Sequence, residues 1–173
     1  MSAGTPDYAR ALFCNEKAID ASSSDQEWAE AKNHWGICQI HLGKLDEAMG
    51  AFTEVADRPG TSQHPDHLAQ VAGALFGKGV TLGKLGRGQD ELTVYNDLLA
   101  RFGSAAEPAL REPVALALYN KGFTLGQLGR SKDALAAYDD LLARFGSAAE
   151  PALREIADDV RRFRDSLRGM AAK

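Results

Sequence analysis

Three side chains on one predicted helix have the residue types of a metal site. His34, Cys38 and His41 are spaced four and three residues apart, so they share a face of a helix with about 3.6 residues per turn. Two such side chains four residues apart can hold one zinc ion. His41 lies about 10.5 Å along the axis from His34, so the three cannot bind the same ion. No carboxylate or second cysteine pair completes the set, and we expect no metal and no other cofactor. A metal or small-molecule sensor that uses His34 and Cys38 is the remote alternative.

Residues that could bind phosphate or catalyse a reaction give no stronger signal. His64 and His67 flank a predicted helix start, where Asp66 complements the helix dipole. The arginines between 161 and 168 are interleaved with aspartates, which is typical of a solvated ion-pair face. The net charge of −4 argues against general binding to a phosphate backbone. We therefore expect no enzyme and no nucleic-acid partner.

One pattern recurs along the chain with a period of 43 residues. The positions that keep this spacing comprise two sets of glycines, one of aromatics and one of prolines: Gly36, Gly79 and Gly122; Gly43, Gly86 and Gly129; Phe52, Tyr95 and Tyr138; Pro65, Pro108 and Pro151. The junction LLARFGSAAEPALRE occurs at 98–112 and again at 141–155. Four independent sets with one period indicate a tandem array.

The elements that carry this pattern are predicted to be helices in one domain, residues 1–173. A first helix occupies 7–20, three two-helix units occupy 22–62, 65–105 and 108–148, and a last helix occupies 151–169. Ser24 and Glu27 form a predicted capping box, and Gly43 is expected to end a helix in the left-handed conformation. A turn is expected at 59–62. Pro113 predicts a kink or a short separate turn in its helix.

These units resemble the tetratricopeptide repeat (TPR) family, whose signature combines an aromatic or Leu followed by Gly with a later Ala-x3-Phe. The matching residues are Trp35, Gly36, Gly43, Ala48 and Phe52 in the first unit and Leu118, Lys121, Gly122, Leu125, Gly129, Ala134 and Tyr138 in the third. The resemblance covers about residues 29–148 and implies an all-α, right-handed solenoid of three helix-turn-helix repeats with flanking helices. The period is extended, since the family's own is 34 residues.

Close packing of the two helices in a unit is expected where the mid-helix glycine faces an alanine, with the aromatic wedged against the neighbouring unit. In the second unit Glu91 takes the position of Ala48 and Ala134. A buried carboxylate is costly unless it is paired or reaches water. Either a locally shifted helix or a functional carboxylate explains Glu91. In the last helix Asp165 replaces the glycine, which predicts a capping helix.

In TPR proteins the first helix of each unit lines a concave groove. Carried onto this chain, the groove residues are Asn33, Ile37, Ile40, His41, Phe76, Val80, Gly83, Lys84, Tyr119, Phe123, Gly126 and Gln127. Gly83 and Gly126 each cost about 1 kcal/mol of helix propensity, which suggests that another group comes close there. Alternatively, these side chains pack between units or are covered by residues 1–20 or the last helix. Some TPR modules grip a C-terminal carboxylate with Lys, Arg and Asn, but here only Asn33 is of that type.

The predicted groove is mostly apolar, which suits an apolar or amphipathic peptide or helix. The leading hypothesis is a non-catalytic protein–protein interaction scaffold or adaptor. The alternative is a self-associating repeat module, a homo-oligomer. Apolar runs are too short to span a bilayer, so we expect no membrane partner. The sequence MSAGTPDYAR lacks a secretory pattern, and two unpaired cysteines fit a reducing compartment, so we expect a cytoplasmic location.

Overall fold

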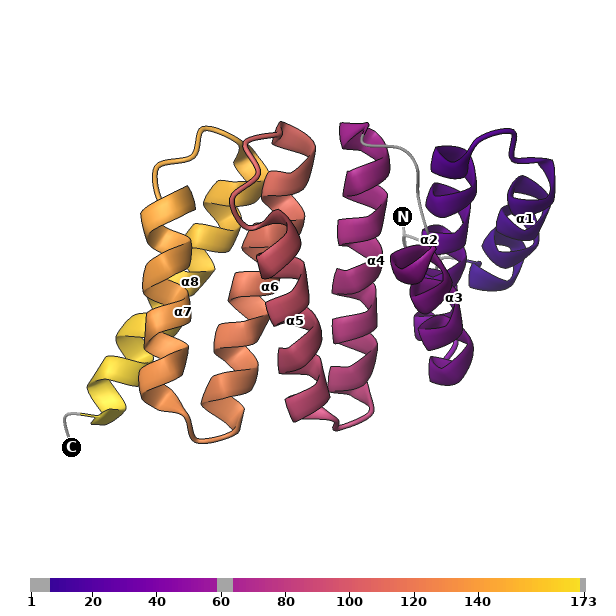
Figure 1. The fold of residues 1–173 in the computed structure, drawn as a ribbon. Coiled ribbons are helices and arrows are strands. Elements are labelled where there is room, and N and C mark those ends of the chain that lie inside the picture. Colours follow the sequence, from indigo (N-terminus) through magenta and orange to yellow (C-terminus); the bar gives the residue numbers. More distant parts are fainter. Residues whose placement is uncertain (1–6, 59–63, 172–173) are drawn as a thin grey trace, which may run out of the picture.

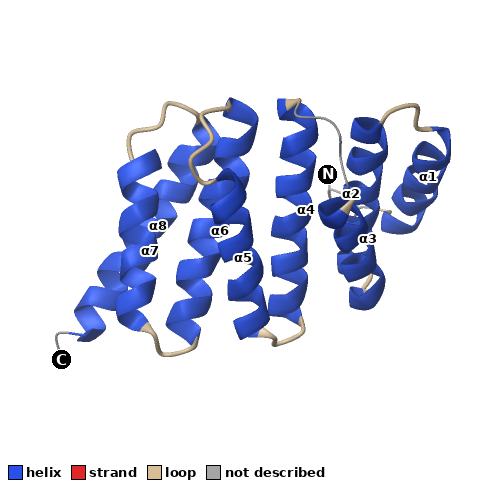
Figure 2. Ribbon diagram, in the orientation of Figure 1, coloured by secondary structure: helices blue, strands red, loops and turns tan. Residues whose placement is uncertain are grey.

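The computed structural model describes residues 7–58 and 64–171, and this part of the chain contains helices and no strand (Figures 1 and 2). The helices in chain order are α1 Tyr8–Ala21, α2 Asp25–His41, α3 Leu45–Asp57, α4 Pro65–Lys84, α5 Gly88–Phe102, α6 Pro108–Gln127, α7 Ser131–Phe145 and α8 Pro151–Ala171. The first and last helices agree with the predicted ranges 7–20 and 151–169 to within about two residues. The predicted turn at 59–62 lies outside the described residues.

The helices form one row in which sequence neighbours lie side by side, with α1 at one end and α8 at the other (Figure 1). The first helices of successive units, α2, α4 and α6, also contact one another directly, and α6 in turn contacts α8. Their partners α3 and α5 each contact the first helix of their own unit and that of the next, and α7 contacts α6 and α8. The fold is therefore the helical repeat that the 43-residue period predicts.

Glycines end the first helix of every unit. Gly43, Gly86 and Gly129 have φ angles of 75°, 71° and 74°, a left-handed conformation that glycine adopts without steric cost. Each is followed by an N–H that returns to a carbonyl of the last helical turn, as in Lys44 N to Gln39 O at 2.9 Å. The expectation for Gly43 is confirmed, and the same turn recurs in all three units.

One of the two hydrogen bonds of the predicted capping box is confirmed. The Ser24 side chain accepts a hydrogen bond from Glu27 N at 3.2 Å, so Ser24 is the N-cap. The Glu27 carboxylate instead accepts from the backbone N–H and the hydroxyl of Ser23, one residue earlier, both at 2.8 Å. These hydrogen bonds from Ser23 lower the pKa of Glu27.

The glycine at the middle of each first helix faces the aromatic ring of its own unit. A Cβ on Gly122 would lie 2.7 Å from Cδ1 of Tyr138, and one on Gly36 would lie 2.8 Å from Cζ of Phe52. The expected contact of glycine with alanine is therefore wrong, because the ring fills the space opposite the glycine. Phe52 also lies against Gly77 of the next unit, at 2.6 Å from a Cβ built there, so it does wedge between units.

Two further expectations concern helix continuity. Helix α6 runs from Pro108 to Gln127 through Pro113, so a separate turn at that proline is wrong. Helix α5 has the bounds of α7 displaced by the 43-residue period, so the local shift proposed to explain Glu91 is also wrong. Glu91 therefore occupies the alanine position itself, and its accommodation is described below.

The two identical junctions adopt the same conformation. Gly103 and Gly146 both have a φ of −62°, and their N–H groups donate to Leu99 O and Leu142 O at 2.9 Å. The carbonyl of each of these glycines also accepts a hydrogen bond from an arginine of a later helix, Arg144 of α7 at 2.7 Å for Gly103 and Arg161 of α8 at 2.6 Å for Gly146. One stretch of sequence thus gives the same structure at both places.

Candidate functional site

The first helices of the three units line a concave hollow with a volume of about 580 Å³. Its walls are mainly apolar and come from α2, α4 and α6: Ile37, Ile40, Phe76, Val80, Ala109, Pro113 and Leu116. Ile37 is 45% exposed although it is a large aliphatic side chain. The exposed apolar surface follows from the helix period, because a second stripe beside the packing stripe faces away from the partner helix.

Seven of the predicted groove residues line this concave groove: Asn33, Ile37, Ile40, His41, Phe76, Val80 and Lys84. The structure brings them together from α2 and α4. Their role in binding remains a prediction. The lining residues that sequence reasoning missed are His34, Phe52, Gln70, Gly73, Gly77, Pro108, Ala109, Glu112, Pro113 and Leu116. Those on α6 lie in its N-terminal half, about one to three turns before Tyr119, the first residue predicted on that helix.

The predicted residues of the third unit lie elsewhere. Tyr119 and Phe123 contact Phe163 of α8 edge-on, with ring centroids 5.9 and 6.2 Å apart. Tyr119 lines a smaller adjoining hollow between α6 and α8, whereas Phe123 stays 42% exposed. Of the alternatives for these aromatics, contact with the last helix therefore applies. Gln127 is exposed at the end of α6.

The two glycines predicted to allow a close approach behave differently. A Cβ on Gly83 would lie 3.0 Å from both carboxylate oxygens of Glu91, so the glycine makes room for that side chain. A Cβ on Gly126 would meet nothing within 4 Å. The expectation of a close neighbour is therefore confirmed at Gly83 and wrong at Gly126, which faces open space.

Asn33 joins α2 to α4 at the base of the concave groove. It is only 7% exposed, and its Nδ2 donates to the backbone carbonyl of Gln70 at 2.9 Å and to Gln70 Oε1 at 3.0 Å. Its Oδ1 has no hydrogen-bond partner among the described residues. The amide donors of Asn33 are thus already used to hold two units together.

Two of the three side chains that suggested a metal site, Cys38 and His41, have other contacts. Cys38 is buried and accepts a weak hydrogen bond from Asn15 Nδ2 at 3.7 Å, and burial raises the pKa of its thiol. His41 stacks on Tyr8 of α1 with ring centroids 4.3 Å apart, a contact that the sequence did not indicate. Among the described residues no group of three His, Cys, Asp or Glu side chains could hold a metal ion.

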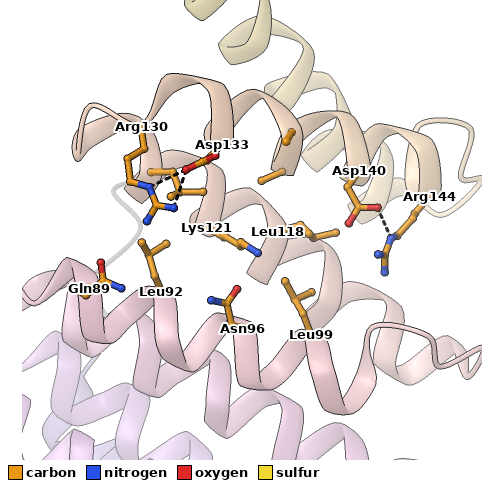
Figure 3. Close-up of a pocket in the computed structure, with 13 residues that line it drawn as sticks. Gln89, Leu92, Asn96, Leu99, Leu118, Lys121, Arg130, Asp133, Asp140 and Arg144 are labelled. Carbon is orange, nitrogen blue, oxygen red and sulfur yellow. Dashed lines mark hydrogen bonds and ion pairs between the residues drawn. The ribbon is translucent and has the colours of Figure 1, made fainter.

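A second hollow of about 500 Å³ lies between α5 and α7, with α6 as its floor (Figure 3). Leucines from α5 and α6 form much of it: Leu92, Leu99, Leu118 and Leu125. Lys121 reaches into the middle of the hollow, opposite Asn96 (Figure 3). Leu118 is two positions, about 200°, round α6 from Leu116, so this hollow is on the other side of the row from the concave groove.

The family model of the tetratricopeptide repeat matches residues 116–148. These residues comprise most of α6, all of α7 and the start of the following junction. The chain resembles the TPR family. Searches among curated proteins and among solved structures gave no match. The resemblance inferred from the sequence is thus confirmed, and the match falls on the unit whose signature residues are the most complete. Repeats of this family generally mediate protein–protein interaction.

Within residues 7–58 and 64–171, no helix is both long and apolar enough to cross a bilayer.

The main departure from the TPR pattern is a buried polar cluster in the second unit. Glu91 stands in the alanine position and is 8% exposed. Burial raises the pKa of its carboxyl, and hydrogen bonds from Thr124 and Tyr95 partly offset this rise in pKa. Asn120 Nδ2 donates to the Tyr95 hydroxyl at 3.3 Å. Burial, together with the Glu91 charge, raises the pKa of Tyr95. Glu91 is therefore enclosed by the α4, α5 and α6 helices and lines neither hollow.

Proposed function

We propose that this chain is a non-catalytic scaffold or adaptor that binds an apolar or amphipathic segment of a partner protein in the concave groove. The observation that carries the proposal is the apolar hollow built by three successive first helices, in which Ile37 remains 45% exposed. Burying one such side chain is worth about 1.5–3 kcal/mol, so several of them together can support a specific complex.

The charged residues at the groove suggest how a segment would lie. Lys84 stands at the C-terminal end of α4, whereas Glu112 stands near the N-terminus of α6. Glu112 also lines the hollow beside Tyr119, together with Glu155, which is the same repeat position on α8. A segment with a basic group toward Glu112 and an acidic group toward Lys84 would complement both ends.

Pro113 adds a possible backbone contact at the same place. Proline has no N–H, so the carbonyl of Ala109 lacks the donor that the next helical turn would normally supply. Both residues line the concave groove. The backbone N–H of a bound segment could donate to this carbonyl, which would fix the register of the segment.

The test compares a substitution on α2 with one at Leu42, the residue that caps the C-terminus of α2. Ile37→Asp places a charge in the groove, whereas Leu42→Asp makes the same change at a leucine that is 42% exposed and does not line the groove. Phe76 is less suitable, because its ring stacks on Tyr95 and packs against the core. Peptides are selected on the wild-type chain from a random display library, and their affinities are measured by fluorescence anisotropy.

We expect Ile37→Asp to weaken these peptides about tenfold or more and Leu42→Asp to leave them unchanged. Equal affinity in both variants, with helicity preserved in circular dichroism, would contradict the groove. Sedimentation over a range of concentrations tests the alternative. A dimer that forms in the wild type and is lost in Ile37→Asp would assign the groove to a second copy of the chain.

A further inference from the structure

The hollow between α5 and α7 contains a cation without a counterion. Lys121 is half-buried at its floor and forms no ion pair or hydrogen bond with any residue in the described part of the chain. Around it stand Leu92, Leu99, Leu118 and Leu125. A compact ammonium next to so much apolar surface would be costly to enclose without a partner of opposite charge.

Comparison with the next unit explains why Lys121 is unpaired. The repeat position of Lys121 is occupied in α8 by Arg164, and that of Asn96 is occupied in α7 by Asp139. Arg164 Nη1 lies 3.4 Å from Asp139 Oδ1, so there the acid of one unit neutralises the cation of the next. Between the second and third units the acid is replaced by a neutral amide, and Lys121 keeps its full charge.

The other cations of the hollow are already neutralised. Arg130 pairs with Asp133 at 2.7 Å and Arg144 pairs with Asp140 at 2.7 Å, at the two ends of the hollow (Figure 3). The lining thus carries one more positive than negative charge in a chain whose net charge is −4. The excess is located at Lys121, where Gln89 and Asn96 add polar side chains.

We propose that this hollow, which we call the Lys121 site, binds a partner protein segment whose carboxylate pairs with Lys121 and whose flanking apolar side chains pack on the leucines. The carboxylate supplies the charge that Asp139 supplies to Arg164 in the following unit. The site lies on the opposite side of the helix row from the concave groove, so the two segments would bind independently.

The decisive variant is Asn96→Asp, which supplies from within the chain the acid that the site lacks. The neighbouring unit shows that an aspartate is accommodated at this position. The new carboxylate would pair with Lys121 and repel the ligand. Lys121→Gln removes the cation, and Lys132→Gln, an exposed lysine of α7 outside the hollow, is the charge-matched control.

Peptides from a random display library are selected on the wild-type full chain after counter-selection on the Asn96→Asp variant. Selected sequences are synthesised with free and with amidated C-termini, which separates a terminal carboxylate from that of an Asp or Glu side chain. Affinities are then measured by fluorescence anisotropy. We expect a carboxylate flanked by apolar residues in the selected set, and a loss of about tenfold or more in both Asn96→Asp and Lys121→Gln.

The controls are expected to keep wild-type affinity. Neither Lys132→Gln nor the groove variant Ile37→Asp should change it, so a failure of the Lys121 site is distinguishable from a failure of the concave groove. Selection of peptides without any carboxylate, the absence of any selected peptide, or equal affinity in Asn96→Asp would overturn the proposal. So would dimerisation that Asn96→Asp abolishes, since the occupant would then be a second copy of the chain.

Discussion

Two glycines of α6 provide a sharp test of the packing, because they receive the same substitution and have opposite surroundings. Gly122 faces the ring of Tyr138, which is 1% exposed, and a Cβ there would lie 2.7 Å from Cδ1 and 2.9 Å from Cζ. Gly126, one turn later, has nothing within 4 Å of an added Cβ. Alanine stabilises a helix interior, as at Gly122, by about 1 kcal/mol relative to glycine, and by no more than that at Gly126, the last residue but one of α6.

The expected magnitudes follow from these contacts. At Gly126 the propensity term acts alone, so Gly126→Ala should raise the free energy of unfolding by up to about 1 kcal/mol. At Gly122 the ring must move, and overpacking of a filled core typically costs about 1–3 kcal/mol. A buried aromatic between two helices has little room to yield, so we expect Gly122→Ala to lower the free energy of unfolding by about 1–2 kcal/mol after the propensity gain.

Urea unfolding followed by far-ultraviolet circular dichroism measures both variants against the wild type. The unfolding slopes should agree, because neither variant changes the surface exposed on unfolding. The contacts predict opposite signs and a gap of about 1–3 kcal/mol between the two alanine variants. Stabilisation by Gly122→Ala, or similar shifts at the two sites, would refute the contact between the mid-helix glycine and the aromatic ring.

Two further predictions concern charged and aromatic contacts. Burial raises the pKa of Glu91 in the folded state above its unfolded value, so the wild type should lose stability relative to Glu91→Gln as the pH rises above the unfolded carboxyl pKa of about 4.3. Chemical unfolding at several pH values checks this, and a pH-independent difference would contradict it. Phe163→Ala removes two edge-on contacts, with Tyr119 and Phe123, and should lower the free energy of unfolding by about 1–3 kcal/mol. Thermal unfolding measures this loss against Phe13→Ala, a control at a side chain that is 60% exposed. Equal shifts in the two variants would argue against these contacts.

The helices and their ends were predictable because they depend on local chemistry. Gly43, Gly86 and Gly129 end helices through their own backbone freedom, and Ser24 caps one with its own side chain. The 43-residue spacing then extends each local result to the other units. No knowledge of neighbouring helices is needed for either step.

The contents of the spaces between helices were less predictable. The period places Gly122 and Gly126 on predicted faces of α6, but only the structure shows that a ring opposes the first and that the second is open. Likewise, Glu91 in an alanine position is explained by Gly83, which lies on another helix and supplies the missing volume. Such compensation depends on which residues meet across an interface, and spacing along one helix does not contain that information.

The candidate site was predictable in part for the same reason. Positions on α2 and α4 follow from the face that the helix period exposes. The groove continues to α6 at Glu112 and Leu116, not at Tyr119 and Phe123, because Phe163 of α8 occupies the surface beside the latter pair. The Lys121 site depends on a difference between adjacent units, since Asn96 stands at the repeat position that Asp139 occupies in the third unit.

The identical junctions have a consequence for the length of the molecule. Because residues 98–112 and 141–155 share both sequence and conformation, a further copy of residues 108–150 could be inserted after Glu150 without altering either splice point. The first copy would retain α5 as its neighbour, and the last would retain α8. Such an insertion would add one more inner helix to the row, so the reach of the binding surface could grow in whole units while both ends of the molecule stay unchanged.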